Sequence, residues 1–517
     1  MKIDINKNNV QQNKKSPIAF KGPLDGAITQ ALITIDTNPM VNAALVDVFS
    51  MVIPRTYVDT KERNKYAGAE TLFRELTGTV IVCLSSGFIA KGIAKLYNKF
   101  VEPNTKINSN TWVADDSLNL LKHSWDKSEN NVEEYVSHVL KNSSGTDGKL
   151  TSEWKNIDWE NTEWIDNPKW EKLNWENPEF KNIHADLKSE SQIIKTLSKI
   201  TEDKNIAKKD AQQILEIIGS RITNALKVGN SVSVKLDDKT LNSSISNIVR
   251  DVYDLGKTVF TNKSINIDSA LNKLQKMNKV KTLGALAIAS TLGLTNQYVN
   301  RLITKKRTGT DAFVGEVDYK QIKEEKQKDE KNKNSAKLFG LKLLASAGII
   351  ALAAGVMKIR NPKEFVKKLE FTGPITSGNA IKTVYTATLV GRFLASKNET
   401  ELRETATRDY LGFLNWLVLG GFAAKGVANL LDKSKGSLFN INKEGKGLKH
   451  WLGNISLKSH AEIASKGSEF AKKNIWKLNA AHASGLIYST LALGVLLPLL
   501  NISITKSKHK KQKNINT

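Results

Sequence analysis

One uncharged stretch constrains the fold more than any other part of the sequence. Residues 484–504 read SGLIYSTLALGVLLPLLNISI and contain no charged side chain. This length matches the roughly 20 residues that a helix needs to cross a bilayer. Pro498 would break a helix in water, but in a membrane neighbouring helices can satisfy the carbonyl that it frees. The stretch therefore predicts a membrane-spanning helix, with a buried helix of a soluble core as the alternative.

Four other apolar segments extend this prediction to a bundle. They are residues 76–96, 283–303, 338–357 and 411–431. The segment at 283–303 is the weakest candidate, because several asparagine and glutamine side chains interrupt it. Together the five segments predict an all-α, membrane-associated helical bundle with the lipid bilayer as its partner.

Residues 101–279 differ in composition from the rest. They are polar, and their acidic and basic side chains nearly cancel, so the net charge of +25 lies in the more apolar parts. Apolar side chains recur at helical spacing across residues 191–226. We therefore expect a soluble, mostly helical insert. The other polar segments predict a disordered basic N-terminus (1–19), a charged linker (307–336) and a basic tail (509–517).

The basic charge has two interpretations. Lysine and asparagine are abundant even in segments that look structural, which favours a coding bias over a binding surface. The alternative is a peripheral protein that binds anionic lipid or nucleic acid. The single cysteine, Cys83, excludes an intrachain disulfide. The polar N-terminus lacks the apolar region of a cleavable secretory signal.

The chain also matches itself. Residues 87–96 read GFIAKGIAKL, and residues 421–430 read GFAAKGVANL. Weaker matches follow in the same order: FKGPL at 20–24 with FTGPI at 371–375, Glu70, Thr71 and Arg74 with Glu404, Thr405 and Arg408, and Gly284, Gly293 and Asn300 with Gly485, Gly494 and Asn501. Because chance matches are rarely collinear, we expect an internal duplication.

The duplication divides the chain into two units. The first has its first half at 20–100, the insert at 101–279 and a second helix at 280–306; the second covers 371–508. Residues 337–370 hold the additional apolar helix between them. With two spans in each unit and one between, the units would cross the membrane in opposite directions; without the span between them, they would run parallel.

Repeated residues suggest how the helices pack. Ser86, Ala90 and Ala94 lie four apart, so they form a strip of small side chains that lets two helix backbones approach closely. Glu70 and Arg74, like their counterparts in the second unit, have the spacing of an i,i+4 ion pair at the membrane interface.

Lys91 and Lys425 are the first candidate binding residues. They occupy the same place in the two repeated segments. A lysine there either anchors the helix by extending to the headgroups or forms an anion or substrate site. We favour the anchor, because anchoring lysines are the commoner kind.

A tryptophan-rich segment at 153–181 supplies the other candidates. Its aromatic residues recur about every five positions: Trp154, Trp159, Trp164, Trp170, Trp175 and Phe180. This period fits neither a helix nor a strand, which favours an irregular loop, with a pentapeptide-repeat solenoid as a weaker alternative. The functional alternative is a row of indoles that stacks on a glycan or protein partner. The intervening acidic residues argue against nucleic acid.

No catalytic or metal-binding motif is recognisable. The sequence lacks GxxxxGK[ST], HExxH, GxSxG and paired CxxC, and its seven histidines are scattered. We therefore expect no cofactor, no metal and no enzymatic activity.

Short motifs in the first hundred residues carry a family resemblance. They are FKG at 20–22, VIPRT at 52–56, VD at 58–59, AGAET at 67–71, RE at 74–75 and TGTV at 77–80. With them, the region resembles an uncharacterised bacterial family of membrane-associated proteins. The resemblance implies membrane association and no assigned activity.

The favoured functional hypothesis is a non-enzymatic protein of the bacterial cytoplasmic membrane that anchors the insert for binding or scaffolding. One alternative is a transporter or channel-like bundle built from two repeats. The other is the peripheral basic protein described above.

Overall fold

The structure is a computed structural model, which describes residues 39–100, 111–308, 335–361 and 378–515 with short gaps. The gaps are 148–149, 165, 168–169, 229–232, 242, 360, 434–435, 442–444, 449, 452–454 and 465, and the residues 28, 29, 31, 32, 365 and 369 are also described. The expected disordered N-terminus, most of the charged linker and the FKGPL and FTGPI motifs lie outside the described residues.

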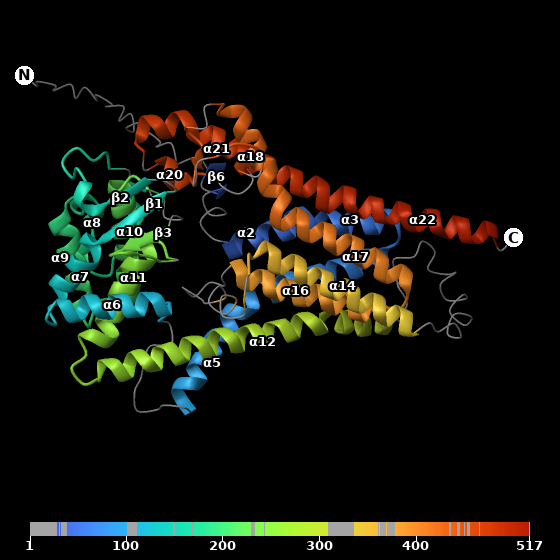
Figure 1. The fold of residues 1–517 in the computed structure, drawn as a ribbon, viewed down its shortest axis with the longest axis horizontal. Coiled ribbons are helices and arrows are strands. Elements are labelled where there is room, and N and C mark those ends of the chain that lie inside the picture. Colours follow the sequence, from blue (N-terminus) through green and yellow to red (C-terminus); the bar gives the residue numbers. More distant parts are fainter. Residues whose placement is uncertain are drawn as a thin grey trace, which may run out of the picture.

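Long helices form a bundle on one side of the molecule, and the insert lies at one end of it (Figure 1). The bundle contains α2 (Pro39–Val46), α3 (Ile53–Glu62), α4 (Lys65–Thr79), α5 (Ser86–Phe100), α12 (Ile267–Thr308), α14 (Ser335–Val356), α16 (Gly378–Ala395), α17 (Glu399–Leu414), α18 (Gly420–Leu431), α21 (Ser468–Ser489) and α22 (Leu497–Ile515). Four π-helical segments continue these helices without a break: η1 (Asp47–Val52), η2 (Val80–Ser85), η7 (Asn415–Leu419) and η8 (Thr490–Leu496). The prediction of an all-α protein is confirmed.

The insert is mostly helical but also contains a small sheet. Its helices are α6 (Asp115–Lys127), α7 (Val132–Lys141), α8 (Ile183–Asp186), α9 (Glu190–Glu202), α10 (Lys208–Ala225) and α11 (Ile245–Leu255), which the π-helical η6 (Gly256–Phe260) extends. The strands β1 (Ser143–Asp147), β2 (Leu150–Glu153), β3 (Ser233–Leu236) and β4 (Lys239–Leu241) pair antiparallel in the order β2-β1-β3-β4. A second small module packs on α18 and α21; it contains β5 (Phe439–Ile441), β6 (Ile455–Leu457) and α20 (His460–Ala464).

Three described helices are long and apolar enough to cross a membrane. They are Lys65–Phe100, Ala336–Val356 and Ser468–Ser507. These helices contain the predicted spans near 76–96, 338–357 and 484–504. The segments 283–303 and 411–431 are also helical, but they are not among the three.

Each half of the bundle contributes three long helical stretches, not the two that the sequence predicted. They are α2–α3, α4–α5 and α12 in the first half, and α16, α17–α18 and α21–α22 in the second, with α14 between the halves. Both halves therefore run in the same direction through the bundle (Figure 1). Of the two orientations that the sequence left open, the order of helices in the bundle agrees with the parallel one, because α2–α3 and α16 add a third stretch to each half.

The small-residue strip packs as predicted. Ser86, Ala90 and Ala94 are fully buried, and α5 lies against α12. In the second half, a side chain added at Gly485 of α21 would meet the backbone of Gly420 in α18. The helix backbones therefore approach closely in both halves.

Replacing Ala90 by Leu tests this packing. The larger side chain has no space between α5 and α12, so we expect a loss of about 1–3 kcal/mol in the free energy of unfolding. The isomeric change Ile89→Leu on the same helix serves as the control and should cost less. Detergent or thermal unfolding of the purified variants measures both. Equal tolerance at the two positions would show that the strip does not form a tight contact.

The core of the insert buries carboxylates beside its aromatic side chains. Trp125 and Phe260 stack with ring centroids 5.0 Å apart, and Tyr135 meets both rings edge-on at 5.5 and 5.3 Å. Burial on α11 raises the pKa of Asp251 to about 7, although Arg250 lies 3.0 Å away and opposes this shift. The Asp251 carboxyl is therefore protonated more readily in the folded insert than in the unfolded chain.

The buried Asp251 predicts a pH dependence of stability. Its folded pKa of about 7 exceeds the unfolded value of 3.8, so the folded state binds the extra proton between these pH values. The insert should therefore gain stability as the pH falls from 7 toward 5. Seven of the ten tryptophans lie in the insert, so tryptophan fluorescence during thermal unfolding reports on it. The Asp251→Asn variant should flatten this dependence; an unchanged slope would contradict the assignment.

Candidate functional site

The bundle buries a group of charged side chains that sequence analysis did not identify. We call it the arginine cluster. Its members are Arg55, Arg63, Arg74, Arg392 and Arg408 with the acids Asp59, Glu75, Glu404 and Asp409. They lie on or directly beside α3, α4, α16 and α17, so the cluster joins helices from both halves of the bundle.

Glu75 is the most widely shared acid of the cluster. Its Oε1 lies 3.4 Å from Arg55 Nη1 and 3.1 Å from Arg74 Nη2, and its Oε2 lies 3.1 Å from Arg392 Nη2. Arg392 also lies 3.3 Å from Asp409 Oδ1. Each of these side chains is at most 8% exposed. A buried charge is costly unless it is paired, so these pairs hold α3, α4, α16 and α17 in one arrangement.

The second half supplies one matching pair, and a further pair joins the two halves. Arg408 Nε donates to Asp409 Oδ1 at 2.9 Å, as Arg74 donates to its own neighbour. Arg63, the residue after α3, pairs with both Asp59 and Glu404. This last pair closes the cluster between α3 and α17.

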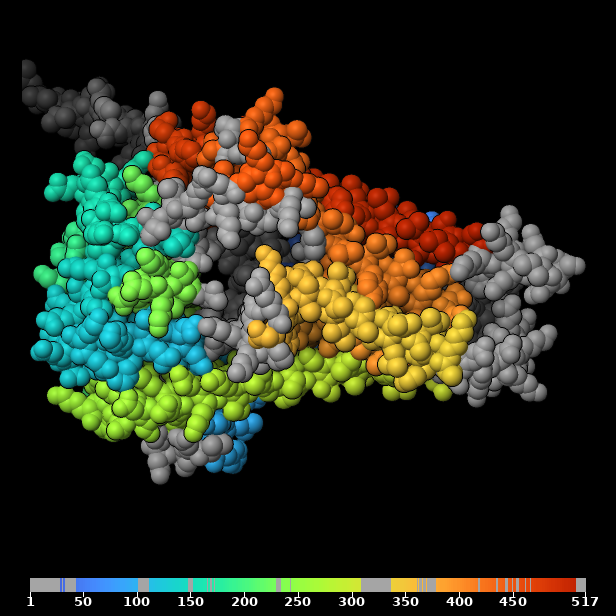
Figure 2. Space-filling model, in the orientation of Figure 1, coloured from blue at the N-terminus to red at the C-terminus, as the bar shows by residue number. Residues whose placement is uncertain are grey.

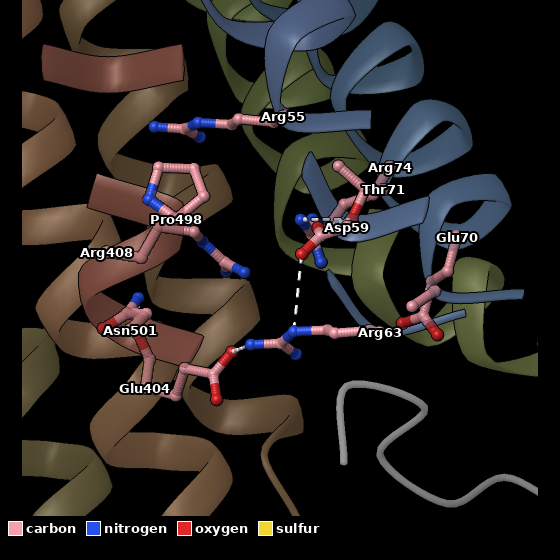
Figure 3. A pocket seen from close by; sticks show the side chains of 11 residues that line it. Arg55, Asp59, Arg63, Glu70, Thr71, Arg74, Glu404, Arg408, Pro498 and Asn501 are labelled. Carbon is pink, nitrogen blue, oxygen red and sulfur yellow. Dashed lines mark hydrogen bonds and ion pairs between the residues drawn. The ribbon is translucent and has the colours of Figure 1, made fainter. Parts of the chain in front are cut away.

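A cavity of about 30 Å³ lies within the cluster. Its wall contains Arg55, Asp59, Arg63, Ala67, Glu70, Thr71, Arg74, Glu404, Arg408, Pro498 and Asn501. Arg63 and Arg74 extend into it from one side and Arg408 from the other (Figure 3). The volume exceeds the roughly 10–15 Å³ that one water molecule requires.

The four π-helical segments of the bundle lie close to the cluster. A π-helix is rare and often occurs at a functional site. On η1, Asp47 accepts a hydrogen bond from Thr79. On η8, the carbonyl of Leu493 accepts one from Arg55 Nε at 2.9 Å. A polar contact thus forms in the middle of the apolar stretch that most strongly predicts a membrane span.

The i,i+4 ion pairs expected from the sequence do not form. Among the described residues, no ion pair joins Glu70 to Arg74 or Glu404 to Arg408. The arginines pair with adjacent acids instead, and Glu404 is 5% exposed and not at an open interface. The signal in the sequence was an Arg-acid doublet, RE at 74–75 and RD at 408–409. It was missed because both doublets end just before the apolar segments.

Lys91 and Lys425 do not meet in a common cavity. Lys91 lies half-buried on α5, and neither lysine lines the cavity described above. Lys425 Nζ donates to the carbonyl of Trp451 at 3.1 Å and lies 5.1 Å from the centre of its ring. Its contacts are those of a lysine that attaches α18 to the module of β5 and β6.

The tryptophan-rich segment is packed against the insert and does not present an open row of indoles. Trp154 and Trp170 are 4% and 3% exposed, and Trp159, Trp164 and Trp175 are half-buried. Short 3-10 turns support it at η3 (Trp154–Asn156), η4 (Trp170–Lys172) and η5 (Pro178–Phe180). The guanidinium carbon of Arg221 lies 5.4 and 5.2 Å from the rings of Trp164 and Trp170. The indoles thus contribute to the core, and the described part of the segment forms an irregular loop.

Among the described residues, no three His, Cys, Asp or Glu side chains are grouped so that they would hold a metal ion. No family model, curated protein or solved structure matches the chain. The arginine cluster is therefore interpreted from its own geometry.

Replacing Arg392 by Gln tests the importance of the cluster for stability. The change leaves Glu75 and Asp409 buried with one cation fewer, and removing one partner of a buried pair costs about 3–5 kcal/mol. The control is Lys337→Gln, since the pair of Lys337 with Glu399 is exposed and such pairs contribute about 0–1 kcal/mol. Unfolding of both purified variants in detergent gives the comparison. Equal losses would contradict a special role for Arg392.

Proposed function

We propose that the chain is an integral protein of the bacterial cytoplasmic membrane whose helical core anchors the insert for binding or scaffolding, without catalysing a reaction. The observation that carries this proposal is the outer surface of α14. Phe339, Leu343, Leu344 and Ile350 are each about half or more exposed, and Figure 2 shows α14 on the outside of the bundle. An exposed apolar surface of this kind is stable in contact with lipid and is unfavourable in water.

Corresponding contacts in the two halves support the proposed duplication. Asn64 and Asn398 cap α4 and α17 in the same way, by accepting backbone hydrogen bonds from the first turn. The π-helical η2 and η7 then follow at matching positions. The spacing between the two caps in the sequence equals that between Glu70 and Glu404.

The third stretch of each half also packs on the first stretch of the other. A side chain added at Gly293 of α12 would overlap Thr388 of α16, and one added at Gly494 of η8 would overlap Pro54 of α3. In the sequence, the separation between Pro54 and Thr388 equals the separation between the two capping residues Asn64 and Asn398. These exchanged contacts support two similar units around a common axis between them.

Two attachments support an anchoring role. Asn278 Nδ2 and Lys281 Nζ on α12 donate to the carbonyls of Val113 and Thr111 at 2.7 and 2.6 Å, where the chain enters the insert. At a second place, the carboxylate of Glu163 accepts a hydrogen bond from the first backbone N–H of α21 at 2.7 Å. The insert is thus fixed to the core from two sides. A protein or glycan partner would contact its remaining surface, because the indoles are largely used in packing.

A transporter or channel-like bundle is the second candidate. The arginine cluster and the π-helical segments favour it, because ionisable groups beside membrane helices often mark an ion or substrate path. The cavity of about 30 Å³, however, has room only for one small group and not for an extended substrate or an open path. A peripheral basic protein is disfavoured by the apolar exterior of α14.

Cysteine labelling tests membrane insertion and its direction. Cys83 is buried, so Cys83→Ser gives a background for one new cysteine at a time. Lys195 is exposed on the insert, and Lys506 is exposed on α22, the helix that runs to the far end of the bundle (Figure 1). In intact spheroplasts an impermeant maleimide should label only one of Lys195→Cys and Lys506→Cys, because the bilayer separates them.

Permeabilised cells provide the control, since both cysteines should then react. Labelling of both positions in intact cells, or of neither, would contradict a core that crosses the membrane. Release of the chain from membranes by alkaline carbonate would contradict insertion independently.

A further inference from the structure

We propose that the cavity in the arginine cluster binds a small tetrahedral oxyanion of the phosphate or sulfate class. This inference goes beyond the anchoring role, and either can fail without the other. The site lies between α3 and α4 on one side and α17 and α22 on the other.

The first argument is the number of arginines for each carboxylate. Arg55, Arg74 and Arg392 share Glu75, and Arg392 shares Asp409 with a further arginine. In the wall of the cavity itself, the four arginines Arg55, Arg63, Arg74 and Arg408 face three acids, Asp59, Glu70 and Glu404, so one arginine is in excess there. Like charges that are buried together repel one another, so an additional anion beside them would lower the free energy of the folded state.

The second argument is a donor without an acceptor. Arg55 is 4% exposed, and its Nη2 has no hydrogen-bond partner among the described residues. Arg55 belongs to the wall of the cavity. An unsatisfied buried donor is costly, so an acceptor in the cavity would lower the free energy of the folded state.

The third argument is the direction of the side chains. The guanidinium groups of Arg63, Arg74 and Arg408 point toward the same space from two different helices and a helix end (Figure 3). A guanidinium group presents paired N–H donors that match the oxygens of phosphate and carboxylate. The nearby Glu404 already accepts hydrogen bonds from Arg63 and from Thr505, which leaves Arg74 and Arg408 as the main ligands.

The fourth argument is size and enclosure. The cavity of about 30 Å³ has space for one small ion and not for an extended substrate. Ala67 and Pro498 provide apolar parts of its wall, and a low local dielectric strengthens the attraction between an anion and the arginines. The phosphate group can come from a free ion or from the headgroup of an anionic lipid, and the experiment separates these sources.

The test measures the thermal unfolding of the full chain in detergent with increasing phosphate or sulfate, at an ionic strength held constant with chloride. We expect a saturable rise in the unfolding temperature. In Arg408→Gln the apparent affinity should fall on the order of tenfold to a hundredfold, because a charge-assisted hydrogen bond is lost. A rise equal to that in chloride alone would overturn the proposal for free anions.

A second variant, Ala67→Leu, keeps the test valid even if Arg408→Gln does not fold. Ala67→Leu fills the cavity without removing a charge, and it should abolish the effect of phosphate. The matched control is Ala69→Leu on the same helix, because Ala69 is exposed and its replacement should leave the effect intact. An effect of phosphate that survives Ala67→Leu would place the anion elsewhere and overturn the assignment.

The lipid source is tested in nanodiscs. If a headgroup supplies the phosphate, phosphatidylglycerol should stabilise the chain more than phosphatidylcholine, and Ala67→Leu should remove this difference while free phosphate has little effect. The absence of any specific effect of phosphate, sulfate or phosphatidylglycerol would show that the cavity holds water only. Membrane insertion measured by cysteine labelling would then still stand.

Discussion

The carboxylate of Glu75 is surrounded by three guanidinium groups, and the packing of the bundle depends on this contact. Taking a charge out of water costs several kcal/mol unless an opposite charge accompanies it. Glu75 lies on α4, and its partners Arg55 and Arg392 lie on α3 and α16. These helices can therefore pack only in a register that brings the three side chains together. In a membrane, apolar helices alone would slide past one another at little cost, because lipid and side chains are similarly apolar.

The sequence predicted the broad architecture because helix length and apolarity are local properties. The apolar helices near 76–96, 338–357 and 484–504, which are long enough to cross a membrane, could be identified from their composition, and the close packing at Ala90 from the spacing of small residues. The arginine cluster depends on contacts between residues more than 300 positions apart, such as Glu75 with Arg392. An i,i+4 spacing says which pairs are able to meet on a helix, but it does not say whether the acid next in the sequence is the better partner, as Glu75 is for Arg74.

The tryptophan-rich segment also shows that a local sequence pattern does not determine tertiary contacts. Its regular spacing suggested a repeated surface. In the folded insert, however, each indole packs separately, and the indoles are buried to different depths. Asp210 of α10 is fully buried and accepts hydrogen bonds from the backbone N–H groups of Glu176 and Asn177 at 2.9–3.2 Å. This single carboxylate orders the end of a loop that has few backbone pairs of its own. Neither the depth of each indole nor the partner of Asp210 is encoded in a local pattern.

The continuity of α12 has a mechanical consequence. One unbroken helix runs from Ile267 in the insert to Thr308 at the far end of the bundle, a length of about 63 Å at 1.5 Å per residue. A tilt of the insert by about one degree would therefore move the far end by about 1 Å, provided that the helix moves as a rigid rod. Near that end, Arg301 of α12 pairs with Glu401 of α17, close to the arginine cluster. Force applied to the insert would thus be transmitted as a strain on buried charges at the opposite side of the bundle.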